Sequence, residues 1–212
     1  LVSALFTQIC YGEIMRKLFN YLFLIFLIIY VPSHADDISE YEIEGISIGD
    51  SLLDYMSKEK IEDSIKFPYE RHDKNIGKDV AKVFYDKNLN VYDALYIDFK
   101  TTDNIFEILT INGTLFYDDN IKECYKKQIQ LVEELKLVFK NANVKKEGPI
   151  NHQAYPNGEV KKIRYSFFIN KNAQSNLEII CYDIAEELKK RDRLVISFKS
   201  KKFNEFANII YK

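Results

Sequence analysis

The sequence predicts an α+β fold in which helices pack on one face of an antiparallel sheet. Two amphipathic helical patterns are each followed by three strand-like runs, and the two helices begin about seventy residues apart. That order is typical of helices packed against antiparallel strands. It is also compatible with a tandem α-β-β-β repeat, with halves at 41–117 and 120–199 and a C-terminal helix at 201–211. The halves share no evident sequence similarity, so the repeat is an alternative within the same class.

The first half opens with a short apolar strand at 41–48. Asp50 is expected to cap the helix that follows, because an aspartate oxygen accepts hydrogen bonds from the free amides of a first helical turn. Apolar residues recur at helical spacing from Leu52 to Ile65. The polar stretch 66–78 contains a proline and a glycine and predicts a loop.

Three strands are expected next, at 80–85, 91–100 and 105–117. In the second of them, Tyr92 and Tyr96 fall on one face, while the more apolar residues fall on the other. Tyrosines on a solvent-exposed strand face are typical of surfaces that bind another molecule, so Tyr92 and Tyr96 are a candidate recognition surface. Packed tyrosines whose hydroxyls reach water would give the same pattern.

The second half contains the longest helix. Asn120 is expected to cap it, and apolar residues recur every three or four positions from Ile121 to Ala142. The segment 143–158 predicts a loop, because it is polar and contains turn signals with proline and glycine. Strands are expected at 160–169, 177–183 and 194–199, and a last helix carries Phe203, Phe206, Ala207 and Ile210 on one face.

A secretory signal peptide is expected at 15–35. Arg16 and Lys17 give it a cationic start, and residues 18–31 form an uncharged, mostly apolar stretch. A proline and small residues precede Asp36, so cleavage is expected after Ala35. An uncleaved anchor is the alternative, but a helix of this length spans about 21 Å, less than the roughly 30 Å of a bilayer core.

Residues 36–212 are then the single α+β domain, periplasmic or secreted. Residues 1–14 lack an initiating methionine and precede the signal peptide, so we interpret them as upstream translation outside the native protein. The net charge of 36–212 is −3, which argues against nucleic acid and against a membrane recruited by bulk charge. No stable membrane insertion is expected after cleavage. Nearly all cationic residues of the domain are lysines, and arginine is rare.

Cys124 and Cys181 are expected to form a disulfide. The chain has three cysteines, and Cys10 lies upstream of the predicted signal peptide, so the exported part keeps an even number, which favours pairing in an oxidising compartment. Cys124 lies on the apolar stripe of the long helix, and Cys181 has the parity of the apolar side chains in its strand, so both face the helix–sheet interior. A pair of buried free thiols is the alternative.

Two sequence resemblances bear on the fold and the location. The run IEGISIGDSLLDYMSKEKI at 43–61 is similar to the opening of small bacterial envelope domains of the outer-membrane-assembly lipoprotein and β-lactamase-inhibitor-protein type. That resemblance implies helices on antiparallel sheet and binding of other proteins without catalysis, although the lipidated cysteine of those lipoproteins is missing. The runs GISIGDSLLDY, NIKECYKKQ, EIICYD and DRLVISFKSKKF together resemble exported proteins of unknown function from marine alphaproteobacteria of the Pelagibacter type. The second resemblance implies no activity or ligand.

The sequence offers little catalytic chemistry. A cysteine hydrolase would use Cys124, near a helix N-terminus, with His72 or His152 as base, but Cys124 belongs to the apolar stripe. Glu70, His72 and Asp73 are neighbours that could bind a metal, yet no HExxH or paired CxxC spacing supports a metal site. The glycines form no nucleotide-binding motif, so no cofactor is expected.

The predicted function is therefore that of an exported, non-enzymatic binding or envelope-interaction domain. Another envelope protein is the candidate partner. The alternative from a different class is a small periplasmic hydrolase that uses Cys124, or a carboxylate, with His72 or His152.

Overall fold

The computed structural model describes residues 38, 41–66, 79–118, 120–169 and 176–210, with the side chains of all but 176 and 208–210. Residues 36–212 form one compact unit. The predicted upstream segment at 1–14 and the predicted signal peptide at 15–35 lie outside the described residues.

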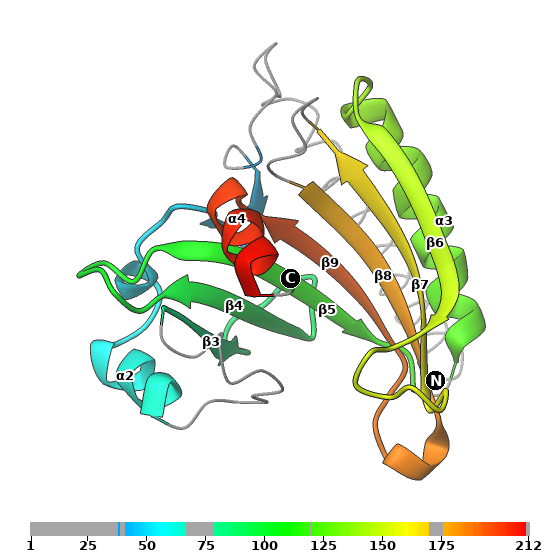
Figure 1. Cartoon of the computed structure of the whole chain (residues 1–212), viewed down its shortest axis with the longest axis horizontal. Helices are drawn as coiled ribbons and strands as arrows, with labels where there is room; N and C mark the ends of the chain where they lie inside the picture. Colours follow the sequence, from blue (N-terminus) through cyan, green and yellow to red (C-terminus); the bar gives the residue numbers. More distant parts are fainter. Residues whose placement is uncertain (1–37, 39–40, 67–78, 119, 170–175, 211–212) are drawn as a thin grey trace, which may run out of the picture. The chain divides into compact units, whose positions relative to one another are not determined.

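A seven-stranded antiparallel sheet is the main element of the structure (Figure 1). Its spatial order is β3-β4-β5-β9-β8-β7-β6. Strands β3 to β5 come from the first half of the domain and β6 to β9 from the second, so the halves meet where β5 pairs with β9. The predicted α+β class is confirmed. The strands span Val80–Tyr85 (β3), Ala94–Lys100 (β4), Ile108–Phe116 (β5), Asn143–Asn151 (β6), Val160–Phe168 (β7), Asn176–Ile184 (β8) and Arg193–Lys199 (β9).

The predicted strand at 41–48 is a small hairpin. Strands β1 (Glu42–Ile43) and β2 (Ile46–Ser47) are joined by Glu44 and Gly45, which have φ angles of 55° and 77°. The Glu44 carboxylate accepts hydrogen bonds from the backbone N–H groups of residues 90, 91 and 92, at 3.0, 2.6 and 3.1 Å. This contact anchors the hairpin to the segment that leads into β4.

The first predicted helix is divided in two. A short 3-10 helix covers Leu52–Asp54, and the α-helix α2 covers Lys58–Lys66. Ser51, and not Asp50, caps the 3-10 helix, because the Ser51 hydroxyl accepts from the Leu53 N–H. The Asp50 carboxylate instead accepts from the Ser47 N–H at 3.0 Å and from the Tyr55 hydroxyl at 2.5 Å.

The long helix α3 (Ile121–Val138) covers the apolar face of β8 and β9. Asn120 caps it as predicted, with its side-chain oxygen accepting from the Glu123 N–H. Gln128 is buried on the same stripe, and its amide donates to the carbonyl oxygens of Ile163 and Ile179 at 2.8 and 2.9 Å. The helix is therefore held to β7 and β8 by hydrogen bonds as well as by apolar packing.

Cys124 of α3 is bonded to Cys181 of β8. The two Cα atoms are 6.1 Å apart, and both side chains are fully buried. The predicted disulfide is therefore present, and it links the long helix to the sheet.

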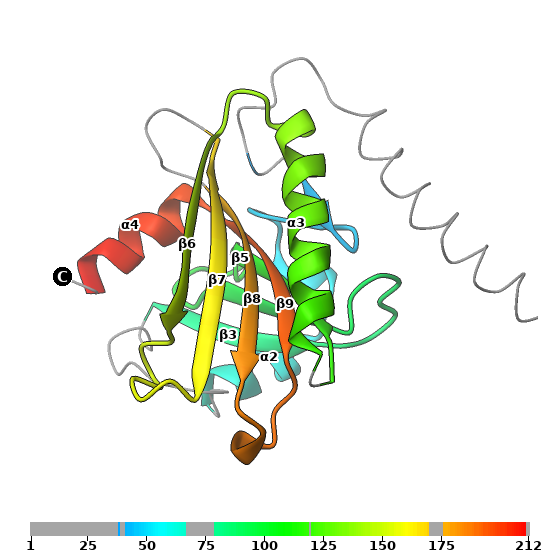
Figure 2. The same ribbon diagram turned by 90° about the vertical axis from the view of Figure 1, so that its right-hand side faces the viewer.

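The last helix, α4 (Lys201–Ile210), follows β9 directly. The Ser200 N–H donates to the Leu109 carbonyl at 3.0 Å, so the chain stays beside β5 as it leaves the sheet. Figure 2 shows α3 and α4 on opposite sides of the sheet. Lys202 Nζ lies 2.5 Å from a Glu107 carboxylate oxygen and holds α4 near the start of β5. Within the described residues, no helix combines the length and apolar character needed to cross a membrane.

The prediction of a loop at 143–158 is wrong for residues 143–151, which form β6. This strand lies at the edge of the sheet and pairs only with β7, so it needs no apolar face. Gly148 has a φ of 108° and sits at a shift in register, where an added Cβ would lie 2.4 Å from the Lys162 carbonyl oxygen. The second half is therefore α-β-β-β-β, one strand longer than the repeat unit that the sequence suggested.

Removing the disulfide should destabilise the fold without changing its topology. The bridge joins residues separated by 57 positions, and the chain-entropy model assigns about 4 kcal/mol to closing such a loop. We expect the free energy of unfolding in urea to fall by about this amount when the protein is reduced. Peptide mapping without reductant should recover the peptides of Cys124 and Cys181 linked to each other. Alkylation of both thiols before reduction would contradict the assignment.

Candidate functional site

The face of the sheet opposite α3 carries polar side chains in register across the strands; we call it the polar face. Tyr96, Asn112 and Ser197 are successive cross-strand partners on it. The Ser197 hydroxyl donates to Asn112 Oδ1 at 2.7 Å. Asn112 Nδ2 donates to the Tyr96 carbonyl oxygen at 2.9 Å and to Thr110 Oγ1 at 3.1 Å. These polar groups satisfy one another and fix the positions of their side chains.

Most carboxylates of the polar face are paired with nearby cations. Glu178 is only 4% exposed, and its oxygens lie 2.6 Å from Lys199 Nζ and 3.6 Å from an Arg164 nitrogen. Arg164 also donates to Glu147. Asp98 accepts from the Thr110 hydroxyl and lies 3.5 Å from Lys82 Nζ. The negative charges in the middle of this face are therefore compensated inside the structure.

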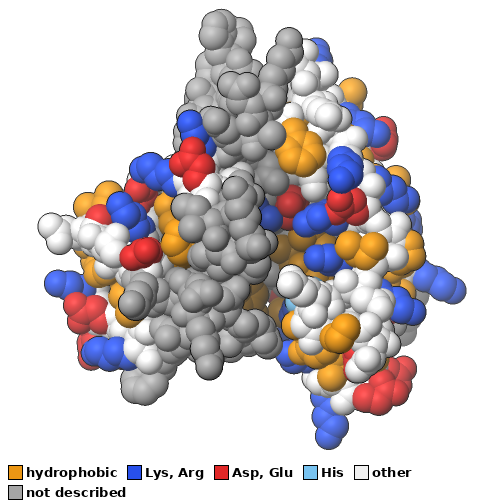
Figure 3. Space-filling model, viewed as in Figure 1, with side chains coloured by type: hydrophobic (Ala, Val, Ile, Leu, Met, Phe, Trp, Pro, Cys, Tyr) orange, Lys and Arg blue, Asp and Glu red, His pale blue; other side chains and the backbone are white. Residues whose placement is uncertain are grey.

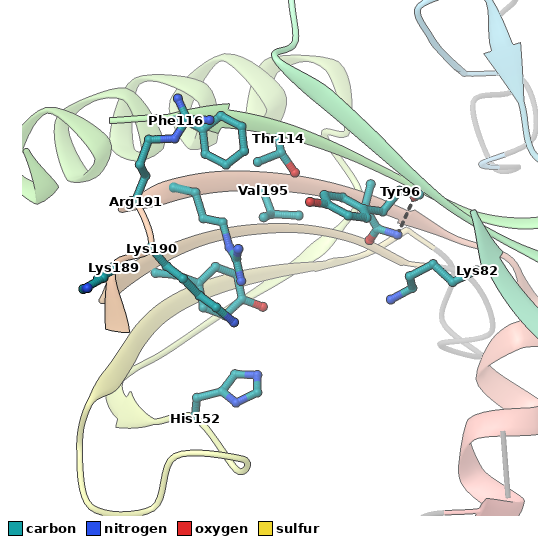
Figure 4. Close-up of a pocket in the computed structure, with 12 residues that line it drawn as sticks. Lys82, Tyr96, Thr114, Phe116, His152, Lys189, Lys190, Arg191 and Val195 are labelled. Atoms are coloured by element: carbon teal, nitrogen blue, oxygen red, sulfur yellow. Dashed lines mark hydrogen bonds between the residues drawn. The ribbon is translucent and has the colours of Figure 1, made fainter. Parts of the chain in front are cut away.

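A cavity of about 350 Å³ opens on the polar face between the sheet and two loops. Figure 4 shows the strands arching over it, with His152 facing it from the β6–β7 connection and Lys190 extending toward it from the β8–β9 connection. Figure 3 shows lysine and arginine side chains bordering a hollow on this face. The lining comprises Lys82, Tyr96, Asn112, Thr114, Phe116, His152, Tyr182, Lys189, Lys190, Arg191, Arg193 and Val195.

The charge of this lining is strongly one-sided. It contains five lysine and arginine residues and no aspartate or glutamate. Lys82 is balanced by Asp98, and Arg191 lies 3.6 Å from an exposed Asp118 carboxylate oxygen. Arg193 forms no ion pair with the described residues. The cavity is therefore electropositive at the end formed by the β8–β9 connection.

The two arginines are oriented by aromatic rings. The Arg191 guanidinium carbon lies 3.6 Å from the centre of the Phe116 ring, and that of Arg193 lies 5.2 Å from the centre of the Tyr182 ring. A ring face attracts a guanidinium group without cancelling its charge. A guanidinium group has five N–H donors, so contact with a ring face leaves N–H groups able to donate to another group.

The electrostatics of the neighbouring side chains agree with a crowded cationic environment. Burial raises the pKa of the Tyr182 hydroxyl, and the positive charge of Arg193 opposes that rise. Burial lowers the pKa of Lys162, the cross-strand neighbour of Tyr182, and the positive charge of Arg164 lowers it further.

One buried hydroxyl of the lining has no hydrogen-bond partner. Thr114 is 1% exposed, and its Oγ1 atom bonds to no described residue. An unsatisfied buried polar group costs about 1–3 kcal/mol. A polar ligand group or a water molecule in the cavity would be the natural partner for this oxygen.

The structure separates the two tyrosines of the predicted recognition surface. Strand β4 begins at Ala94, so Tyr92 precedes it and does not follow its alternation. The Tyr92 ring lies over Gly113, where an added Cβ would be 2.5 Å from the ring. The Cβ position at Gly113 and the side chain of Asn112 lie on opposite faces of the sheet, because successive residues of a strand alternate. Tyr92 therefore packs on the α3 side, whereas Tyr96 lines the cavity.

The residues proposed for catalysis are also separated. Cys124 is bonded to Cys181 on the α3 side of the sheet, so it is not available as a nucleophile. His152 lines the cavity, and its Nδ1 atom accepts from the Ala154 N–H at 3.2 Å. His72 and the proposed metal-binding neighbours Glu70 and Asp73 lie outside the described residues. Among the residues that the structure does describe, no cluster of three histidine, cysteine or carboxylate side chains could hold a metal ion.

Sequence reasoning missed the residues that define the cationic end of the cavity. Phe116, Tyr182 and Arg193 come from three strands and meet through sheet pairing, which a pattern within one segment does not reveal. A local signal was present in the run Lys189-Lys190-Arg191-Asp192-Arg193, which ends at the first residue of β9 and in which two of the chain's few arginines stand two positions apart.

No family model, curated protein or solved structure matches this chain. The chemistry of the cavity is therefore the basis for interpreting its function.

The ion pairs of Glu147 on the polar face predict a specific pH dependence of stability. Hydrogen bonds from Lys145 and then Arg164 lower the pKa of Glu147 from 4.5 to about 2. A lowered pKa in the folded state contributes stability above the unfolded pKa, and this contribution is lost as the pH falls toward 2. We expect Glu147→Gln to be less stable than the wild type at pH 7, with the difference shrinking between pH 5 and pH 2. Urea unfolding across this range measures it, and a difference independent of pH would contradict the pairing.

Proposed function

We propose that this chain is an exported, non-enzymatic binding protein whose ligand occupies the cavity on the polar face. The observation that carries the proposal is the cavity lining itself. It brings fixed N–H donors, hydroxyl groups and ring faces together in a space of about 350 Å³. A concave site with ring faces and a few fixed polar groups is typical of small-molecule binding.

The export part of the proposal rests on the sequence. The cationic start at Arg16 and Lys17, the apolar stretch at 18–31 and the small residues before Asp36 support secretion. The disulfide between Cys124 and Cys181 supports it independently, because disulfides persist in oxidising compartments. We therefore place the binding function in the periplasm or the medium.

The lining favours binding over catalysis. Acid–base or nucleophilic catalysis needs a reactive group within hydrogen-bond reach of a second group that activates it. In the cavity, the His152 Nδ1 atom already accepts from the Ala154 N–H at 3.2 Å, and the lysine and arginine side chains of the lining are hydrogen-bond donors. The lining thus supports holding a ligand in one orientation.

Filling the cavity tests this function. Val195 lines the cavity and lies between Thr114 and Ile180 in the register of the sheet, so Val195→Trp should occupy the space of a ligand. The matched control is Leu137→Trp, since Leu137 is 73% exposed on α3. Saturation-transfer NMR with a library of neutral, cationic and anionic fragments would detect ligands of the wild type.

We expect the fragments that bind the wild type to bind Val195→Trp at least tenfold more weakly and Leu137→Trp unchanged. Thermal unfolding of both variants checks that each is folded. The proposal fails if no fragment binds the wild type, or if the same fragments bind folded Val195→Trp with unchanged affinity.

A further inference from the structure

We infer that the ligand of this cavity carries a phosphomonoester group, bound at the Arg193 end, on an uncharged body that extends toward Tyr96. The inference rests on the proposed binding function and names the chemical class of the ligand. It follows from the asymmetry between the two ends of the cavity.

The end formed by the β8–β9 connection is built to bind an oxyanion. Arg191 and Arg193 stand two positions apart in the sequence, and each guanidinium group lies over a ring face. Lys189 and Lys190 lie beside them in the lining. A guanidinium group donates two parallel hydrogen bonds to a phosphate, and hydrogen bonds between two charged partners are about twice as strong as neutral ones.

The opposite end offers neutral contacts. Lys82 is paired with Asp98 at 3.5 Å, so its charge is compensated within the sheet. Beside it, Tyr96 and Asn112 provide a ring and an amide. The buried Thr114 hydroxyl has no partner among the described residues. Thr114 lies between Asn112 and Phe116 along β5, on the same face of that strand. These groups suit an uncharged body with a planar ring or hydroxyl groups.

The composition of the chain supports an oxyanion with planar recognition. The sequence contains 30 lysine and arginine residues, of which five are arginines, and two of the five line this cavity. A requirement for positive charge alone would be met by lysine, the usual cation of this chain. Arginine at both positions over a ring indicates that the geometry of the fork matters.

A doubly charged group fits the charge of the site better than a singly charged one. After the compensation of Lys82 by Asp98 and of Arg191 by Asp118, Lys189 and Arg193 are side chains of the lining whose positive charges no described carboxylate pairs with. A phosphomonoester carries close to two negative charges near neutral pH, and three acceptor oxygens. A sulfate ester has the same shape with one charge, so it separates charge from shape in an experiment.

Calorimetric titration of the oxidised full chain at low ionic strength tests this inference. The probes are phenyl phosphate, phenyl sulfate and phenol. The variants are Arg193→Lys, which keeps the charge but removes the fork, and Arg191→Lys, which does the same on the neighbouring ring. Lys122→Gln is the control for bulk charge, because Lys122 is an exposed residue of α3. Thermal unfolding confirms that each variant is folded.

We expect phenyl phosphate to bind the wild type more tightly than phenyl sulfate, and phenol to bind least. Arg193→Lys should weaken phenyl phosphate binding about tenfold or more, because hydrogen bonds to charged groups carry that much affinity. Lys122→Gln should leave it unchanged.

Three results would overturn the inference. They are absence of phenyl phosphate binding, equal affinity for phenyl sulfate, and equal weakening by Arg193→Lys and Lys122→Gln. Any of these together with a neutral fragment that loses affinity in Val195→Trp would retain the binding function and reject the phosphate class. Loss of all fragment binding would reject both.

Discussion

The pairing of β5 with β9 is the constraint on which the rest of the structure depends. These strands belong to different halves of the chain, and their antiparallel ladder joins the halves into one sheet. The same ladder places Phe116 beside Arg193 and Thr114 beside Val195. The core and the cavity therefore depend on the same strand register. The register that brings the apolar side chains of β5 and β9 together on one face also brings the cavity-lining side chains together on the other. A slip of one residue would exchange the faces and destroy both.

Because side chains alternate along each strand, the two faces of the sheet have different compositions and different roles. On one face, apolar residues and the Cys124–Cys181 bridge hold α3 against the sheet. On the other face, buried carboxylates such as Glu178 are paired with lysine and arginine from neighbouring strands. Because those charges cancel locally, the net positive charge of the polar face is concentrated where the β8–β9 connection meets the cavity. A chain with a slightly acidic overall charge thus presents a cationic pocket.

Much of the fold could be predicted from the sequence, because its patterns are local. Apolar periodicity located α3 and the strands that carry the core, and the parity of Cys181 placed it opposite Cys124. The strand β6 was missed because an edge strand can be polar throughout and because Gly148 and Pro149 are usual turn residues. Tyr92 was assigned to the wrong face because the strand was predicted to begin at residue 91, whereas β4 begins at Ala94 and does not include Tyr92.

The cavity could not be predicted in the same way. Arg193 reaches its environment through pairing with residues 77 and 11 positions away, Phe116 and Tyr182, and neither spacing has a periodicity. The charge run before β9 was visible, but a charge run in a sequence is most often a solvated surface. Its meaning depends on the two ring faces that the sheet brings beneath it.

Chemical-shift mapping of the ¹⁵N-labelled full chain during titration with phenyl phosphate tests the central claim most directly. The claim is that β5–β9 pairing creates a cationic binding site on the polar face. It predicts that the largest amide shifts fall on Phe116, Lys190 and Arg193, while the amides of α3 stay in place. Shifts concentrated on α3, or spread evenly over exposed lysines, would contradict it.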